Sequence, residues 1–149
     1  MKEKNWSIAI LVLAFSLLYS ASIAASDTDN AVRSVMEWMI EVIAPNSDIL
    51  WNVEEPLSAE NWQAYGLAAA AIVEASTAIA EGARSPDGEL WSNEAAWQDL
   101  NTLMKQAAMK AKIASKTKDL DKLYEAGDAL YPPCESCHLQ FNPGVIQQQ

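Results

Sequence analysis

The chain has 149 residues and a formal net charge of −10, from ten Lys and Arg residues against twenty Asp and Glu residues. This length allows one domain plus, at most, a short extra segment. The negative charge excludes general binding to nucleic acid and indicates a soluble protein whose copies repel each other.

The first 24 residues have the features of a secretory signal peptide. A slightly basic start, MKEKNW, precedes the uncharged apolar run SIAILVLAFSLLYSA, and Ser22 and Ala24 place small residues at positions −3 and −1 of a cut after Ala24. The run is short for a membrane span, although an uncleaved anchor is the alternative. We therefore expect residues 1–24 to be removed on export, and residues 25–149 to form one periplasmic domain with no membrane attachment.

Apolar residues then recur at helical spacing in four stretches, and no stretch alternates as a strand does. The first stretch covers about 32–43, is interrupted by Pro45, and can gain another turn at 47–51. Ser58 is a candidate N-cap for an alanine-rich second helix, and Ser92 is a candidate N-cap for the third. The alanines have either high helix propensity or a role in letting a bulky group approach the backbone.

The fourth stretch runs from about Leu120 to Phe141. Gly127 interrupts its apolar face, which either the close approach of a bulky group or a break in the helix would explain. Pro132 and Pro133 fall off that face and remove two helical hydrogen bonds, so we expect a kink, with a break and restart at Pro132 as the alternative. Four helices with short connections predict an all-α, antiparallel up-down four-helix bundle.

Both cysteines and the only histidine of the chain lie in the motif Cys134-Glu-Ser-Cys137-His138, on the apolar face of the fourth stretch. A structural zinc site would lack a fourth soft ligand. A thioredoxin-type pair would lack its βαβ context. A disulfide between the two cysteines would close a very small loop and leave His138 unexplained.

The remaining interpretation of this C-x-x-C-H motif is covalent attachment of one haem c. On a helix, thiols three residues apart point to one side and can add to the two vinyl groups of one porphyrin, while the neighbouring imidazole reaches the iron. Covalent attachment of this kind is made outside the cytoplasm, which agrees with the signal peptide.

A four-helix bundle with C-x-x-C-H near the end of its last helix resembles the cytochrome c′ and cytochrome c-556 family. The stretches that carry the resemblance are ELWSNEAAW (89–97), KDLDKL (118–123) and CESCHLQF (134–141). The resemblance implies thioether bonds at Cys134 and Cys137 and a proximal iron ligand at His138. The chain departs from the family in having Asn142 where a basic residue is common, four positions after the histidine, and in the proline pair before the first cysteine.

The resemblance also implies that the residue facing the iron from the other side belongs to the first helix. That residue is methionine in cytochromes c-556 and an apolar blocking residue in five-coordinate cytochromes c′. Met36 and Met39 both lie on the inward stripe of the first helix, where flexible core filling is the other role open to them. We expect Met36 to bind the iron, with Met39 as the runner-up. Arg33, about one turn earlier, either pairs with a haem propionate or is simply exposed.

These expectations describe a single-electron carrier rather than an enzyme, with redox proteins as partners. The alternative is a five-coordinate haem protein that binds NO or CO, whereas a peroxidase would lack its distal histidine. Six lysines between Lys105 and Lys122 form either a docking patch for a redox partner or a solvated face. Trp38, Ile40 and Trp51, apolar but beside the first stripe, indicate a homodimer through the first helix or a monomer with capping loops.

Overall fold

The computed structural model of the chain describes residues 33–55, 57–82, 85, 87, 88 and 90–146; the expected signal peptide lies outside these residues. The described residues contain helices and no strand, as predicted: α2 (Val35–Trp38), the π-helical η1 (Met39–Ile43), α3 (Ala44–Trp51), α4 (Ala59–Glu81), the 3-10 turn η2 (Trp91–Asn93), α5 (Ala95–Thr117), α6 (Leu120–Phe141) and α7 (Pro143–Ile146). None of the helices in this part of the chain combines the length and apolar character that crossing a bilayer requires.

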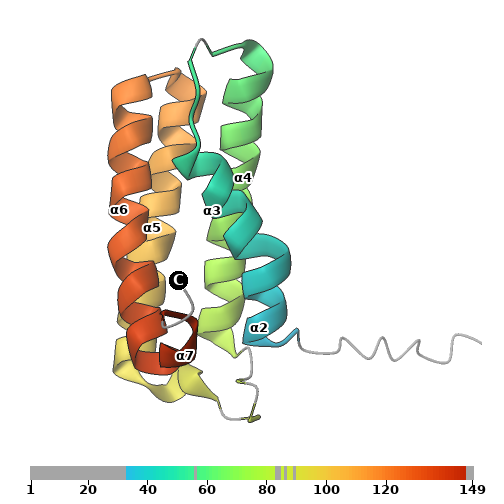
Figure 1. Cartoon of the computed structure of the whole chain (residues 1–149), viewed down its shortest axis with the longest axis vertical. Coiled ribbons are helices and arrows are strands. Elements are labelled where there is room, and N and C mark those ends of the chain that lie inside the picture. The colour runs from blue at the N-terminus through green and yellow to red at the C-terminus, as the bar shows by residue number, and fades with distance from the viewer. Residues whose placement is uncertain (1–32, 56, 83–84, 86, 89, 147–149) are drawn as a thin grey trace, which may run out of the picture. The chain divides into compact units, whose positions relative to one another are not determined.

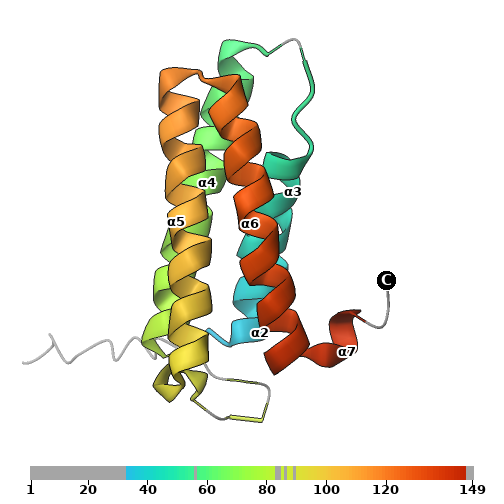
Figure 2. The ribbon, with the colours of Figure 1, turned by 90° about the vertical axis from the view of Figure 1, so that its left-hand side faces the viewer.

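The helices pack in chain order as an up-and-down four-helix bundle, which confirms the predicted fold class (Figures 1 and 2). The first helix is the continuous run α2–η1–α3, which packs against α4. Helix α4 packs against α5, and α5 against α6. Helix α3 also contacts α6 and so brings the first and last helices together.

The first helix continues through Pro45 instead of stopping there. A proline inside a helix lacks an N–H and crowds the carbonyl four residues earlier. The π segment relieves this conflict because its wider turn places Pro45 at the start of α3, with the Ala44 N–H bonded to the Met39 carbonyl. The turn expected at residues 47–51 is present as part of α3.

Helix α4 begins as predicted and α5 does not. Ser58 caps α4 and accepts a hydrogen bond from the Asn61 N–H at 3.2 Å. The prediction of Ser92 as the cap of α5 is wrong: Ser92 lies in η2, and Glu94 is the N-cap. The reason is side-chain packing. The Trp91 ring of η2 packs on the Trp97 ring, with centroids 5.1 Å apart, and this contact fixes the turn before the helix.

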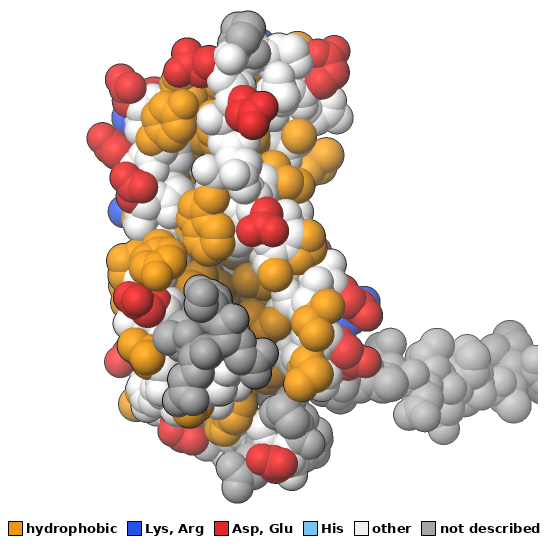
Figure 3. Space-filling model, in the orientation of Figure 1, with side chains coloured by type: hydrophobic (Ala, Val, Ile, Leu, Met, Phe, Trp, Pro, Cys, Tyr) orange, Lys and Arg blue, Asp and Glu red, His pale blue; other side chains and the backbone are white. Residues whose placement is uncertain are grey.

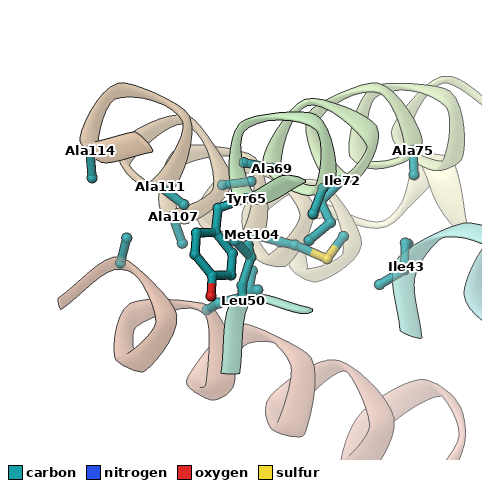
Figure 4. Close-up of a cluster of buried hydrophobic side chains, with 14 of the residues drawn as sticks. Ile43, Leu50, Tyr65, Ala69, Ile72, Ala75, Met104, Ala107, Ala111 and Ala114 are labelled. Atoms are coloured by element: carbon teal, nitrogen blue, oxygen red, sulfur yellow. The ribbon is translucent and has the colours of Figure 1, made fainter. Parts of the chain in front are cut away.

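Small residues let the helices of the bundle approach closely. Alanines of α4 and α5 face the interior around larger side chains such as Tyr65 and Met104 (Figure 4). The buried alanines of these two helices are Ala68, Ala69, Ala75, Ala107, Ala108, Ala111 and Ala114. Their role is therefore close helix packing, in addition to helix propensity.

Helix α6 is unbroken from Leu120 to Phe141, so the alternative of a break at Pro132 is wrong. Pro133 is buried, so the prediction that both prolines fall off the apolar face is wrong for this one: it lies three residues after buried Leu130, on the same face. Gly127 is also explained, because a Cβ atom there would stand 3.3 Å from the Leu50 carbonyl oxygen of α3.

The continuous α6 makes a testable prediction about stability. Leu130 is fully buried just before the proline pair, so Leu130→Ala should lower the free energy of unfolding by about 2–5 kcal/mol in urea titrations. Leu103→Ala, on the exposed face of α5, should change it by no more than about 0.5 kcal/mol. Equal effects at both positions would contradict this placement of Leu130.

Candidate cofactor site

The last turns of α6 place Cys134, Cys137 and His138 in a cleft between α6, α5 and the first helix. All three side chains are partly buried, and all three line an inner cavity of 340 Å³. Cys137 and His138 also line an outer cavity of 490 Å³ beside it. Each volume is within the range of about 300–1,000 Å³ that small-molecule and cofactor sites occupy. Apolar side chains gather in this hollow between α6 and the first helix (Figure 3).

The packing of α5 on α6 determines what faces the two cysteines. Trp97 of α5 meets Phe141 of α6 edge to face, with ring centroids 5.0 Å apart. The two helices are consecutive and antiparallel, so positions equally far from this contact stand opposite each other. Asn101 is four residues after Trp97 and Cys137 is four before Phe141. Met104 is seven residues after Trp97 and Cys134 is seven before Phe141, so these two also stand opposite each other. Both line the inner cavity.

The packing of α3 on α6 sets the positions of Met36 and Met39 along the first helix relative to His138. The Leu50 carbonyl stands against Gly127. Met39 is eleven residues before Leu50, and His138 is eleven residues after Gly127. Equal helical rise therefore places Met39 at about the level of His138. Met39 lines both cavities together with His138.

The other predicted residues of the first helix, Met36 and Arg33, line less of the space around the motif. Met36 is 50 % exposed and lines only the outer cavity, at the level of Phe141. Arg33 lines neither cavity; its guanidinium pairs with Glu41 at 3.3 Å and lies 4.7 Å from the centre of the Trp38 ring. Met39 thus shares both cavities with motif side chains, Met36 shares the outer cavity with Cys137 and His138, and Arg33 shares neither.

Burial sets the protonation of the three motif side chains. It raises the pKa of both Cys134 and Cys137 to about 11, with the neighbouring Cys134 a further cause at Cys137. It lowers the pKa of His138, because an imidazolium is poorly solvated there. His138 is therefore kept neutral near pH 7, which is the form of imidazole that binds a metal.

The pKa shifts of the two thiols and the arrangement of possible ligands distinguish between the chemical roles that the motif could have. A redox-active or nucleophilic cysteine has a lowered pKa, often at a helix N-terminus, whereas both thiols here have raised pKa values and lie in the last third of α6. Both are free thiols. Among the described residues, no three His, Cys, Asp or Glu side chains converge as ligands of one metal ion. The site therefore does not resemble a thioredoxin-type pair or a zinc site.

Two buried polar atoms in the inner cavity were not predicted from the sequence. The Ser47 hydroxyl and the Asn101 side-chain carbonyl have no hydrogen-bond partner among the described residues, although their side chains are only 2 % and 3 % exposed. Leaving such a group unpaired costs about 1–3 kcal/mol. Helical spacing in the sequence could have indicated that these two polar residues face the interior. Ser47 is four residues after Ile43 and Asn101 is four residues after Trp97, so each lies on an apolar stripe.

The residues of this cleft fit a haem c. They supply two thiols three residues apart on one helix face, a neutral imidazole beside them, and a thioether across the cleft at Met39. The unpaired atoms of Ser47 and Asn101 indicate that hydrogen-bonding groups, including water, belong in the inner part of the cavity.

Comparison of the chain with models of protein families, with curated proteins and with solved structures found no match. What the structure itself establishes is a four-helix, all-α domain with Cys134 and Cys137 near the C-terminus.

Burial of the thiols predicts slow alkylation in protein made without a haem-attachment system. At pH 8, a thiol with a pKa of about 11 has about 100-fold less thiolate than one at the ordinary 9.0, and the greater nucleophilicity of the more basic thiolate recovers roughly tenfold of this. Iodoacetamide should therefore label the native protein at least about tenfold more slowly than the same protein in urea. The native rate should rise as the pH approaches 11, and equal native and unfolded rates at pH 8 would show that the thiols are not buried.

Proposed function

We propose that this protein is a periplasmic monohaem c-type cytochrome of the cytochrome c′ and c-556 type, and that it carries single electrons. The observation that carries the proposal is the shared cavity of Cys134, Cys137 and His138, with Met39 facing them from the first helix. When bound, the haem would supply a one-electron iron couple, and the polypeptide would supply the ligands, the apolar surroundings and the local charge.

Each residue of the motif has a distinct role in this proposal. Cys134 and Cys137 form the thioether bonds, and their spacing of one helical turn directs both sulfurs into the cleft. His138 would hold the iron through one ring nitrogen. Its lowered pKa favours this role, because no proton has to be displaced from the nitrogen near pH 7.

For the sixth ligand, we propose the runner-up of the sequence analysis. Met36 was the first choice and Met39 the runner-up. Met39 is the stronger candidate because it lines both cavities at the level of His138, whereas Met36 is half exposed and lines the outer cavity alone. A thioether at this position would occupy the site at which NO or CO would otherwise bind, so electron transfer is favoured over gas binding.

Two further parts of the proposal concern the surface of the first helix. Arg33 already pairs with Glu41, is exposed and lines neither cavity, which favours the alternative of an exposed arginine over a propionate partner. Ile40 is exposed next to Met36 on the same helix, which supports a homodimer through the first helix, with part of this apolar surface covered by the second copy.

Absorption spectra of the exported, haem-loaded protein in both oxidation states test the ligand assignment. The intact protein should be low-spin in both states and should not respond to CO. Met39→Ala should convert it to a high-spin form that binds CO, because no thioether remains opposite His138.

Two matched variants control for loss of a methionine as such. Met36→Ala should leave the spectra unchanged if Met39 is the ligand, and so should Met109→Ala, on the exposed face of α5. A spectral change with Met36→Ala alone would return the ligand to Met36. A high-spin intact protein that binds CO would favour the gas-binding alternative.

A further inference from the structure

An exposed pair of aromatic side chains lies where α3 meets α6. Trp51 is 43 % exposed and Tyr131 is 54 % exposed, and their rings meet edge to face with centroids 6.2 Å apart. The Trp51 indole N–H donates to the Gly127 carbonyl at 3.0 Å, which fixes the ring in place. Rigid, exposed tryptophan and tyrosine side chains are typical of binding surfaces, because they offer contact area at little cost in conformational entropy.

This pair lines both the inner cavity of the C-x-x-C-H motif and a hollow on the surface of the protein. Trp51 and Tyr131 both line the inner cavity that contains the C-x-x-C-H side chains. Both also line an open surface hollow of 320 Å³, together with Gly127, Asp128 and Pro132. A molecule seated in the surface hollow would therefore contact the cavity wall itself.

The charged side chains that line the two spaces beside the pair are all acidic among the described residues. Asp48 and Glu135 line the inner cavity and Asp128 lines the surface hollow, and all three are exposed. The Tyr131 hydroxyl donates to the Glu135 carboxylate at 3.4 Å. Among the described residues, no lysine or arginine lines either space. Acidic groups border apolar surface on this face of the molecule (Figure 3).

We propose that Trp51, Tyr131, Asp48, Asp128 and Glu135 form an acidic aromatic rim at which the protein exchanges an electron with a positively charged redox partner protein. This inference rests on the proposed function. A haem held by Cys134, Cys137 and His138 would supply or accept the one electron that the partner gains or loses, and no covalent bond would form or break. Charge complementarity accelerates the encounter, and the aromatic pair supplies the contact over the cavity wall. An acidic partner would instead prefer the lysines between Lys105 and Lys122.

Electron transfer to small inorganic oxidants tests the charge preference of the haem-loaded, reduced protein. The probes are tris(phenanthroline)cobalt(III), a cation, and hexacyanoferrate(III), an anion. Replacing Asp48, Asp128 and Glu135 together by Asn, Asn and Gln should slow oxidation by the cation at least about tenfold at low ionic strength and speed oxidation by the anion. The control triple Glu74→Gln, Glu81→Gln and Asp99→Asn alters exposed carboxylates on α4 and α5 by the same charge and should change the rates far less.

A second readout requires no electron transfer. In NMR spectra, the Trp51 indole N–H signal, assigned by its loss in Trp51→Phe, should broaden with hexaamminechromium(III) and much less with hexacyanochromate(III). The rim triple variant should remove this difference.

The outcomes separate the two proposals. Equal broadening by the two complexes, or equal rate changes in the rim and control variants, would overturn the rim. Faster reaction with the anion that depends on the Lys105–Lys122 segment would also overturn it and would assign docking to an acidic partner. A colourless exported protein would overturn the proposed function, and the broadening would still decide whether the rim attracts cations.

Discussion

The contact of α3 with Gly127 of α6 determines the geometry of the whole cleft. A side chain larger than glycine would push the Leu50 carbonyl away, and the Trp51 indole bonds to the Gly127 carbonyl itself. These two contacts fix how far the first helix is displaced along α6. From that displacement follow the level of Met39 relative to His138 and the position of Trp51 beside Tyr131. The cost of glycine inside a helix, about 1 kcal/mol relative to alanine, is therefore offset by close packing of the two helices.

From this contact toward the C-terminus of α6, the cleft lies between the first helix and α6. The π-helical segment η1 lies at this level and absorbs the conflict that Pro45 would otherwise cause, and π-helical turns are frequent at functional sites. The side chains lining the cleft are mostly apolar, which raises the pKa of the two thiols and lowers that of His138. The same burial thus suppresses thiol chemistry and keeps the imidazole available for a metal.

Much of the fold could be predicted from local sequence signals. Ser58 caps its helix as expected because its hydroxyl acts on backbone groups only a few residues away. The C-x-x-C-H side chains were placed on the apolar face of the last helix because helical spacing alone determines that face. The start of α5 could not be predicted in this way, since Trp91 is held by packing on Trp97 and on Phe141, fifty residues further along the chain.

The finer geometry of the site also depended on long-range contacts. Met36 and Met39 have equivalent spacing on the inward stripe predicted from the sequence, and only their burial and position in the folded chain distinguish them. The unpaired atoms of Ser47 and Asn101 were equally beyond sequence reasoning, because polar residues on an apolar stripe do not show whether their hydrogen bonds are made.

The central claim is that one haem is covalently held by the last helix, and the mass of the intact exported protein tests it most directly. The account predicts the mass of residues 25–149 plus one haem, retained after denaturation, with no free thiol. The mass of the bare polypeptide with two titratable thiols, from cells that attach haem to other c-type cytochromes, would contradict it.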